Sequence, residues 1–358
     1  MRRVTLSDEQ SAVFDELCTF LYESPDRYRV MHGLAGTGKT TVLARIAEEF
    51  PHARLCTMTG KAASVLRNKT GLDAATIHSV FYKLLDEEYD KKGRKKLIFE
   101  NALEDGEMGG SIVLLDECSM INERIARDIF ATGAKIIACG DPGQLPPVEG
   151  EQFFRSPHHT LQTIHRQALE NPIIRQAHRV RSGERYESDG DTFRVMAPRS
   201  LSNEEKLEAD VVLCWTNKTR HAINQHLRSL HGYSIMPHPQ IGEPVMCMKN
   251  ARDFGIFNGA VYTLAEPFME GDTDISLYVD GELIVVPNVT FHGLKSALPS
   301  GVDPVTYFDF GYAMTVHKAQ GSEWNNVILI DEYRRQEQRK EWLYTAITRA
   351  ANKITIIR

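Results

Sequence analysis

The chain alternates between short apolar runs and longer segments whose apolar residues recur every three or four positions. Residues 28–32, 111–115 and 135–139 are short, mainly apolar runs, and each predicts a buried strand. Apolar residues spaced from Val42 to Phe50 mark one face of a helix soon after the first of these strands. Strands that alternate with helices favour an α/β fold with a parallel sheet.

The same alternation begins again from about residue 205. Residues 210–215 predict a strand, and the apolar positions that follow, up to Leu230, predict a helix. Residues 327–330 and 353–357 predict further strands. The chain is therefore expected to contain two tandem α/β units.

Two segments interrupt this plan. Residues 86–109 are highly charged, but Gly93 and the apolar run at 97–99 indicate a small hairpin or arm, with a solvated loop as the alternative. Residues 241–305 are rich in turn-forming residues, and Asn258-Gly259 is a hairpin signal between alternating segments. We expect an arm inserted in the first unit and a small all-β insertion in the second.

Composition is that of an ordinary soluble globular protein, with 358 residues, 42% of them hydrophobic and 25% charged. The first residues lack the apolar core of a signal peptide, and no apolar run approaches the length of a membrane span. The six cysteines never form a C-x-x-C pair, which suits reduced thiols. We therefore expect a cytoplasmic protein without membrane contact. The formal net charge of −6 does not indicate a nucleic-acid partner, although a basic groove can lie on an acidic protein.

The strongest local signal is the stretch Gly33-Leu-Ala-Gly-Thr-Gly-Lys-Thr40, which fits the phosphate-binding pattern G-x-x-x-x-G-K-[ST]. It follows a predicted strand and opens a predicted helix, where backbone N–H groups can surround phosphate oxygens at the positive end of the helix dipole. Lys39 is expected to reach the β- and γ-phosphates of ATP, and the Thr40 hydroxyl to bind Mg²⁺. The residues expected around the nucleotide are Gly33, Ala35, Gly36, Thr37, Gly38, Lys39, Thr40 and Thr41.

Two carboxylates, Asp116 and Glu117, stand where a predicted strand ends. Asp116 is expected to hold Mg²⁺ through water, and Glu117 to polarise the water that attacks ATP. One acid would suffice for binding alone, so the second indicates hydrolysis. Gln144 follows another predicted strand, and its amide can bond the γ-phosphate. A proline-stiffened turn is the alternative interpretation of that segment.

The second half of the chain contains no phosphate loop of its own. It offers isolated basic residues, notably Arg349 near the end of a helical segment. This asymmetry indicates a nucleotide held between two domains, with an arginine that reaches across to stabilise the transition state. Near the N-terminus, Ser7 and Gln10 fit a capping box before a helical face.

In order along nearly the whole chain, the motifs resemble those of superfamily 1 helicases of the RecD/Dda-like type. The motifs are Gln10, GLAGTGKT, TMTGK, TIHS, LLDECSM, GDPGQLPPV, HRQ, WTNK, TVHKAQGSEW and YTAITRA. The resemblance implies two RecA-like domains, with ATP and Mg²⁺ in the cleft between them and single-stranded DNA bound across both. It also implies movement in the 5′-to-3′ direction.

Carried onto this sequence, the resemblance implies roles for further residues. Arg166 and Arg349 match two arginines that approach the γ-phosphate from the second domain, and Gln10 matches a residue that contacts adenine. The positions matched to DNA contacts are Thr59, Lys61, His78, Asn217, Thr315, His317 and Lys318. The last three carry hydroxyl, imidazole and ammonium donors, which suit phosphate oxygens. Further positions matched to the nucleotide are Gln320, Gly321 and Glu323.

The expected domains are a RecA-like domain at residues 1–158 and a second one formed by residues 159–240 and 306–358. Residues 86–109 resemble the family's strand-separating pin, and residues 241–305 its SH3-like insertion. The predicted protein is a monomeric ATP-dependent DNA helicase that acts on single-stranded DNA and forked duplexes, alongside replication, recombination or repair proteins. The alternatives are a P-loop kinase or other phosphotransferase, and a DNA-binding ATPase subunit without unwinding activity of its own.

Overall fold

The chain forms two compact units, Met1–Glu170 and Asn171–Arg358. The computed structural model describes residues 5–358 except 90–94, 102–105, 148–149, 166–169, 234–237, 252–253, 280, 293, 295–297 and 299–302, and of residues 69, 83–89 and 95–101 it describes the backbone only. Both units contain the parallel α/β sheet that the sequence predicts. Within the described ranges, no helix is long and apolar enough to cross a membrane.

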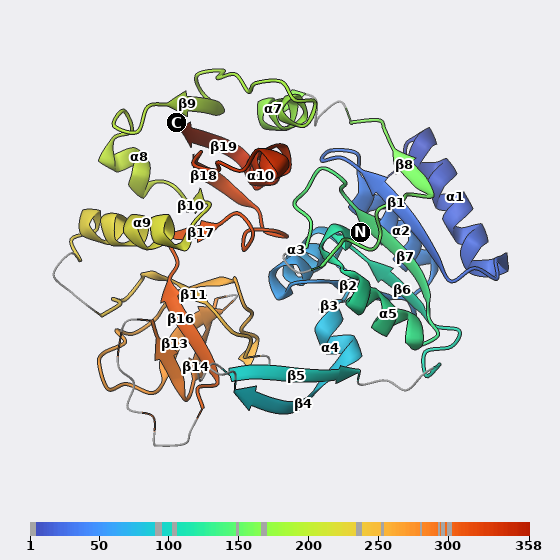
Figure 1. The fold of residues 1–358 in the computed structure, drawn as a ribbon, viewed down its shortest axis with the longest axis horizontal. Coiled ribbons are helices and arrows are strands. Elements are labelled where there is room, and N and C mark those ends of the chain that lie inside the picture. Colours follow the sequence, from blue (N-terminus) through green and yellow to red (C-terminus); the bar gives the residue numbers. More distant parts are fainter. Residues whose placement is uncertain are drawn as a thin grey trace. The chain divides into compact units, whose positions relative to one another are not determined.

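The first unit is built on a six-stranded sheet. Its strands are β1 (Tyr28–Gly33), β2 (Arg54–Thr57), β3 (Ala74–Thr76), β6 (Ile112–Leu115), β7 (Lys135–Gly140) and β8 (His159–Leu161). They lie in the order β3-β2-β6-β7-β1-β8, and every neighbouring pair is parallel (Figure 1). The carboxyl ends of all six strands therefore meet at one edge of the sheet.

Helices cover both faces of this sheet. They are α1 (Asp8–Glu23), α2 (Lys39–Glu49), α3 (Gly60–Thr70), α4 (Ile77–Phe81) and α5 (Glu123–Ala131). Leu114 and Ile137 pack with α1, α2 and α3 in one buried cluster, whereas Val113 and Ile136 pack with α4 and α5 in another. Successive side chains of a strand point to opposite faces, so a nearly continuous apolar run is what a sheet covered on both sides requires.

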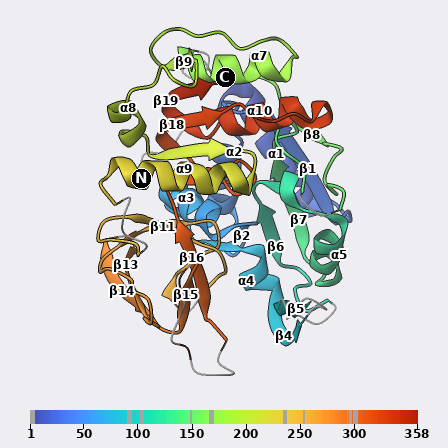
Figure 2. The same cartoon turned by 60° about the vertical axis from the view of Figure 1, so that its left-hand side comes forward.

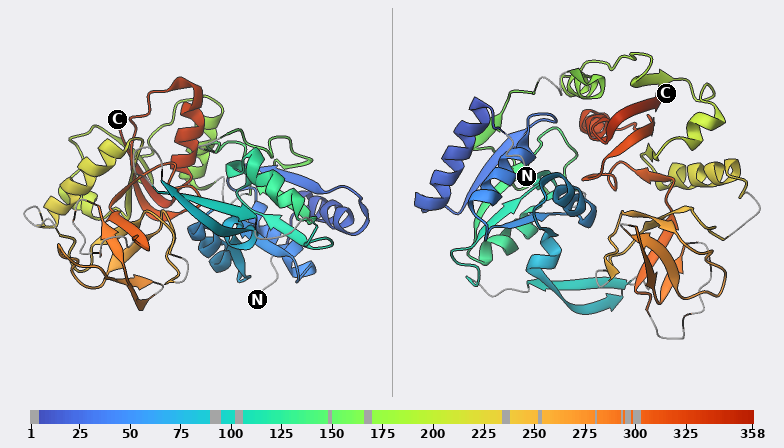
Figure 3. Two further views of the ribbon diagram at one scale, coloured as in Figure 1. Left: turned by 60° about the horizontal axis from the view of Figure 1, so that its bottom comes forward. Right: turned by 180° about the vertical axis from the view of Figure 1, so that it is seen from behind.

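An antiparallel ribbon, β4 (Tyr82–Tyr89) with β5 (Lys95–Asn101), follows α4 and extends away from the first sheet (Figure 3). It lies within the region where the sequence predicts a hairpin or arm, but it begins at Tyr82, before residue 86. Part of the predicted segment, residues 90–94, lies outside the described residues.

The end of that predicted segment belongs to the packed domain. Gly106 N donates to Ala131 O (2.9 Å), Met108 N donates to Thr132 O (2.8 Å), and the Met108 side chain is buried in the cluster around α4 and α5. The buried Met108 and these two backbone bonds therefore attach residues 106–109 to the α/β domain, which the sequence pattern did not predict.

The second unit contains a five-stranded parallel sheet in the order β17-β10-β18-β19-β9. Its strands are β9 (Phe193–Met196), β10 (Val211–Cys214), β17 (Ala313–Thr315), β18 (Trp324–Ile330) and β19 (Ala350–Ile357). Its helices are α7 (Pro172–Arg181), α8 (Asn203–Leu207), α9 (Asn217–Leu230) and α10 (Arg339–Ile347). Helices α7 and α10 lie side by side next to β19 (Figures 1 and 2).

The division between the units comes later than the sequence predicts. We expected the second domain from residue 159, but β8 pairs in parallel with β1 and completes the first sheet. The second unit begins at Asn171. A strand as short and polar as His159–Leu161 gives no apolar run from which it could be recognised.

The all-β insertion is a six-stranded sheet in the order β14-β13-β12-β11-β16-β15. Its strands are β11 (Pro244–Cys247), β12 (Val261–Leu264), β13 (Ile275–Val279), β14 (Glu282–Val286), β15 (Val289–Phe291) and β16 (Thr306–Phe310). Because β16 pairs with both β11 and β15, the sheet continues past the predicted end at residue 305. Two buried ion pairs join it to α9, Arg228–Glu243 (2.7 Å) and Arg220–Asp309 (2.8 Å).

Candidate functional site

The loop between β1 and α2 has the backbone of a phosphate cradle. Gly36 and Gly38 adopt left-handed conformations, with φ of 86° and 77°. A Cβ atom at Gly33 would collide with Thr37 Oγ1, and one at Gly38 would collide with Gln10 Nε2. Only glycine can adopt these left-handed conformations and also lie this close to neighbouring side chains. This explains why the phosphate-binding sequence pattern requires glycine at these positions.

Lys39 is the first residue of α2 and lies inside this loop. Its Nζ donates to Leu34 O (3.1 Å) and lies 3.8 Å from Asp141 Oδ2. Burial disfavours the charged ammonium, but nearby negative groups, above all the Asp141 carboxylate, outweigh it and raise the pKa of Lys39. The ammonium therefore stays charged at neutral pH.

The acidic residues come from the carboxyl ends of β6 and β7. Glu117 N donates to Asp116 Oδ1 (2.9 Å), and Glu117 itself holds a left-handed backbone with φ of 53°. Such a conformation is strained for a residue with a Cβ, and strain of this kind concentrates at functional positions. Both acids contribute to the negative potential at Lys39.

Asp141 has no role in the prediction from sequence, although its carboxylate is the one that pairs with Lys39. It is buried, and its Oδ1 accepts a bond from Gly143 N (2.8 Å). Its signal was available: it directly follows β7, and β7 lies next to the strand that leads into the phosphate loop. The sequence Gly-Asp-Pro-Gly was interpreted as a turn, so the proximity of Asp141 to the phosphate loop was not predicted.

Gln144 lies in the same turn and is buried. Its backbone N–H donates to Asp141 O (3.2 Å), while its side-chain Oε1 has no hydrogen-bond partner among the described residues. A buried amide oxygen without a partner costs free energy, and such groups are enriched where a ligand or water binds. The position agrees with a role beside the γ-phosphate.

The Gln10 side chain joins α1 to the phosphate loop. Its Oε1 accepts from Ser7 N (3.0 Å), which completes the predicted capping box. Its Nε2 donates to Thr37 O (3.1 Å) and lies 2.8 Å from His165 Nε2. To contact adenine, the Gln10 amide would have to replace one of these hydrogen bonds with a bond to the base. His165, whose own N–H donates to Gly36 O (3.1 Å), is a second residue that sequence reasoning left without a role.

The donors expected for a metal are chemically suited to it. Thr40, in the first turn of α2, offers a hydroxyl, and Asp116, at the end of β6, offers a carboxylate. Mg²⁺ prefers such oxygen ligands, together with water and nucleotide phosphates.

Three positions expected to contact DNA follow neighbouring strands of the first unit. Thr59 caps α3 by accepting a bond from Ala62 N (3.1 Å), and Lys61 lies in the first turn of the same helix. His78, in α4 after β3, stacks on Tyr82 with ring centroids 5.2 Å apart. Burial lowers the pKa of Lys61 to about 8.

In the second unit the remaining expected DNA contacts also lie at a carboxyl edge. Asn217 follows β10, and Thr315 ends β17 in register with Cys214. His317 and Lys318 come directly after, and burial lowers the pKa of both side chains. Lys318 Nζ donates to Asn258 Oδ1 (3.2 Å), so the Asn-Gly turn of the insertion holds this lysine.

Residues 316–323 connect the two edges of the second sheet. They start beside Cys214 at the carboxyl end of β10 and stop at Trp324, which is in register with Ala350 at the start of β19. Gln320 and Gly321 are buried in this segment, and Glu323 is exposed. The resemblance implies that this segment contacts DNA near its start and the nucleotide near its end. In the structure the segment runs from the carboxyl edge of the second sheet to its amino edge.

Arg349 lies at the end of that path. Its guanidinium donates to Thr345 O (3.0 Å), Ser322 O (3.1 Å) and Thr348 Oγ1 (3.1 Å), all within the second unit. Its side chain is thus held beside the Gln320–Glu323 stretch. Arg166, the other arginine of the prediction, lies outside the described residues.

His221, His292 and Asp309 have potential ligand atoms within 4.8 Å of one another. The Arg220 guanidinium already donates to Asp309 Oδ2 (2.8 Å) and lies 3.1 Å from His221 Nε2. A fixed positive charge at this distance opposes a second cation, so we assign the group to the ion pair that joins α9 to the insertion.

Models of two protein families match this chain, one in its N-terminal half and one near its C-terminus. Residues 5–197, more than half of the chain, match the AAA domain model. The chain belongs to the AAA domain family. Residues 310–357, which include the TVHKAQGSEW segment and Arg349, match the UvrD-like helicase C-terminal domain. Together these matches confirm the resemblance to superfamily 1 helicases of the RecD-like type.

Curated relatives of this AAA-family chain are helicases and conjugation proteins. The chain is 29% identical over 383 aligned residues to the ATP-dependent RecD2 DNA helicase of Deinococcus radiodurans, covering 98% of this chain and 49% of that protein. It is 26% identical to the conjugal transfer protein TraA of Rhizobium radiobacter, covering 91% of this chain and 30% of that protein. The chain thus spans about half the length of the first relative and less of the second.

Solved structures confirm the fold. Bacteroides Pif1 bound to single-stranded DNA superposes with a TM-score of 0.66 at 20% identity, covering 99% of this chain and 92% of that one. Pif1 helicase from Candida albicans gives a TM-score of 0.56 at 17% identity, covering 99% and 94%. The chain therefore has the fold of two RecA-like domains.

Proposed function

We propose that the protein is an ATP-dependent DNA helicase that moves 5′ to 3′ along single-stranded DNA and separates duplexes. The observation that supports this proposal is that one chain contains two RecA-like sheets whose edges carry different functional groups. The first edge gathers a phosphate loop, Lys39 and three carboxylates, and the second gathers hydroxyl, imidazole and ammonium groups without a phosphate loop.

Hydrolysis would use the residues of the first unit. Lys39 neutralises charge on the β- and γ-phosphates, and Glu117 orients and polarises the attacking water. The free Oε1 of Gln144 is available to accept a bond from that water, or its amide N–H₂ to bond the γ-phosphate. Thr40 and Asp116 would hold Mg²⁺, which when bound supplies further charge neutralisation.

The second unit would supply Arg349 and Arg166 for the charge that develops in the transition state. Support comes from Arg349, whose guanidinium is fixed to Ser322 O beside the residues expected at the nucleotide, Gln320, Gly321 and Glu323. A guanidinium held by backbone carbonyls loses little freedom when it binds an anion, which favours the transition state.

Single-stranded DNA would lie along the carboxyl edges of the two sheets. Thr59, Lys61 and His78 would contact phosphates from the first unit, and Asn217, Thr315, His317 and Lys318 from the second. The β4–β5 ribbon would serve as the pin that meets a fork. The RecD2 relative is named an ATP-dependent DNA helicase, which supports this substrate class. We expect a cytoplasmic monomer that acts with proteins of replication, recombination or repair.

Stimulation of ATP hydrolysis by single-stranded DNA tests this proposal against its main alternative. A translocase is expected to hydrolyse ATP slowly alone and much faster with oligo(dT). A P-loop kinase would instead respond to a small acceptor and ignore DNA. Steady-state phosphate release with and without oligo(dT) distinguishes the two, and a rate unaffected by DNA would reject the helicase proposal.

A further inference from the structure

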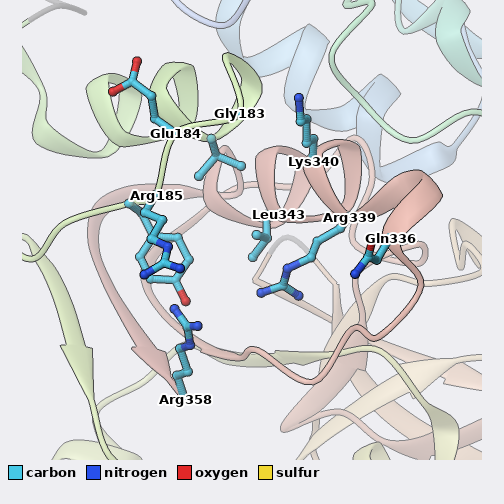
Figure 4. A pocket seen from close by; sticks show the side chains of 10 residues that line it. Gly183, Glu184, Arg185, Gln336, Arg339, Lys340, Leu343 and Arg358 are labelled. Atoms are coloured by element: carbon cyan, nitrogen blue, oxygen red, sulfur yellow. The ribbon is translucent and has the colours of Figure 1, made fainter.

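A cavity of about 340 Å³ opens in the second unit, away from every residue assigned to nucleotide or DNA (Figure 4). It lies between the loop after α7, the start of α10 and the end of β19. The cationic side chains of Arg185, Arg339, Lys340 and Arg358 line it. Val180 and Leu343 contribute buried apolar surface.

The charge around this cavity is one-sided. Its lining contains four cationic side chains and a single acid, Glu184. In Figure 4 the Glu184 carboxylate and the Lys340 ammonium both point away from the three arginines. Arg185, Lys340 and Arg358 form no ion pair within the part of the chain that the structure describes. Such a concentration of positive charge on a protein of net charge −6 is unfavourable by itself and attracts anions.

The four cations come from three separate parts of the second unit. Arg185 follows α7, Arg339 and Lys340 open α10, and Arg358 follows β19. Figure 4 shows Arg185 and Arg358 extending toward one another while Arg339 reaches in from the helix. The Lys340 ammonium lies beside Gly183, where an added Cβ would come within 2.8 Å of Nζ. The tertiary fold, and not a local charge run, therefore creates the cluster.

One wall of the cavity is rigid. Arg339 donates to Asp331 Oδ2 (2.8 Å) and to Tyr333 O (2.7 Å), and the Tyr186 hydroxyl donates to the same Asp331 oxygen (2.7 Å). Burial, and then the bond to Asp331, raise the pKa of Tyr186, so its hydroxyl remains a donor. Asp331 fixes Arg339 in place and leaves Arg185 and Arg358 to meet a ligand.

We propose that this cavity binds a small phosphate monoester whose other part is apolar or aromatic. Guanidinium groups match phosphate oxygens in geometry, and Arg185 and Arg358, which face one another and form no ion pair among the described residues, together match the charge of a phosphate dianion. The volume lies in the range of small-molecule sites, and Val180 and Leu343 provide apolar contact beyond the phosphate.

Phenyl phosphate is a suitable probe because it combines a dianionic phosphate with an aromatic ring. Binding to the full chain would be measured by isothermal titration calorimetry with saturating ADP and Mg²⁺, so that the phosphate loop is already occupied. We expect one site per chain. Phenyl sulfate, which has the same shape and a single negative charge, is expected to bind at least about tenfold more weakly.

Variants at the two arginines that lack intramolecular partners test the location. Arg185→Ala and Arg358→Ala are each expected to weaken phenyl phosphate binding by about tenfold or more. Arg199→Ala is the matched control, since Arg199 is an exposed arginine of the same unit that does not line the cavity. ADP affinity and melting temperature should stay unchanged in all three variants, which shows that each is folded.

The proposal is overturned if phenyl phosphate fails to bind at millimolar concentration, or if it binds the arginine variants and the parent equally. It is also overturned if an aspartate-rich hexapeptide or a short oligo(dT) displaces phenyl phosphate at a lower concentration than phosphate esters do. The first of these competitors would indicate a protein partner, and the second an extension of the DNA path. Because the probe does not depend on ATP hydrolysis, the outcome is separate from that of the helicase proposal.

Discussion

At the scale of single residues, the phosphate loop places one ammonium, that of Lys39, near three carboxylates. Lys39 is buried, and burial alone would lower its pKa, yet Asp141, Glu117 and Asp116 together raise it. Each acid stands at the end of a strand, so its position is fixed by the sheet and not by a loop. Removing one charge or one hydrogen bond should therefore change chemistry more than folding.

Glu117→Gln is expected to keep nucleotide and DNA binding while lowering the turnover number by at least about 10²-fold, because the amide cannot polarise the attacking water. The measurements are steady-state ATP hydrolysis with oligo(dT) and the dissociation constant of a fluorescent ADP. Lys39→Ala is the contrasting variant, since losing the ammonium should weaken binding as well as turnover. Hydrolysis at the parent rate in Glu117→Gln would remove this residue from the mechanism.

If Lys61 contacts DNA as proposed, DNA affinity should depend on pH. Burial lowers its pKa to about 8, so the ammonium is mainly charged at pH 7 and mainly neutral at pH 9. If it contacts a phosphate, affinity for oligo(dT) should fall by up to about tenfold across this interval, as one charge-assisted bond is lost. Arginine stays charged throughout, so Lys61→Arg should reduce that fall. Fluorescence anisotropy at fixed salt measures oligo(dT) affinity for the parent protein and for Lys61→Arg. If affinity depends on pH in the same way for both proteins, Lys61 does not contact a DNA phosphate.

Residue-level reasoning from sequence recognised the functional groups that belong to a known motif. It identified the phosphate loop, Asp116 and Glu117, because strand, loop and helix are contiguous there. It missed Asp141 and His165, whose contacts with Lys39 and Gln10 depend on β7 and residues 162–165 lying beside β1 and α1. Such proximity arises from sheet order, which apolar periodicity does not specify.

At the scale of elements, the chain shows which segments support the core and which project from it. Buried strands were predicted well because both faces of each sheet are covered, which makes their sequences almost continuously apolar. Boundaries were predicted poorly where an element is short or polar, as at β8, and where a single buried residue, Met108, ties a loop to the core.

Shortening this ribbon should separate walking on DNA from splitting a duplex. Lys83 and Glu100 are in register, so replacing residues 84–99 with Asn-Gly should close a tight two-residue turn between them. Tyr82, whose hydroxyl donates to Asp128 Oδ2 (2.6 Å), and Met108 are kept, so the core should stay intact.

We expect the shortened variant to retain most of its DNA-stimulated ATPase activity and to lose most duplex unwinding, since nothing rigid would meet the fork. A control variant that replaces only residues 90–94 with glycine and serine preserves both strands. Gel-based unwinding and phosphate release, measured on the same preparations, give the comparison. Full unwinding by the shortened protein would place strand separation elsewhere.

At the scale of the whole molecule, we propose that the two units contribute different residues to one reaction. The first holds the phosphate loop and its acids, and the second holds Arg349 on the path that leads to His317 and Lys318. The fold, the family and this division followed from the order of motifs along the sequence. The sequence could not supply the later division between units at Asn171, or the cationic cavity, since both depend on long-range packing.

Arg349→Ala tests whether the second unit takes part in hydrolysis. The turnover number should fall by on the order of 10³-fold, while the affinity for ADP changes little, because an arginine of this kind acts on charge that develops in the transition state. The melting temperature must be compared as well, since the guanidinium also bonds Ser322 O and Thr345 O. Lys353→Ala, a change at a partly exposed cation on β19 nearby in the chain, serves as the control. Unchanged turnover in Arg349→Ala would leave hydrolysis to the first unit alone.

The central claim is directional, ATP-driven strand separation, and unwinding of tailed duplexes tests it most directly. Two substrates share one duplex and differ only in whether the single-stranded tail is at the 5′ or the 3′ end. With ATP and Mg²⁺, the protein is expected to unwind the duplex with the 5′ tail and to leave the other intact. No unwinding should occur without ATP or with Glu117→Gln. Preferential unwinding from the 3′ tail would contradict the direction of movement, and failure to unwind either substrate in the presence of ATP would contradict the helicase assignment itself.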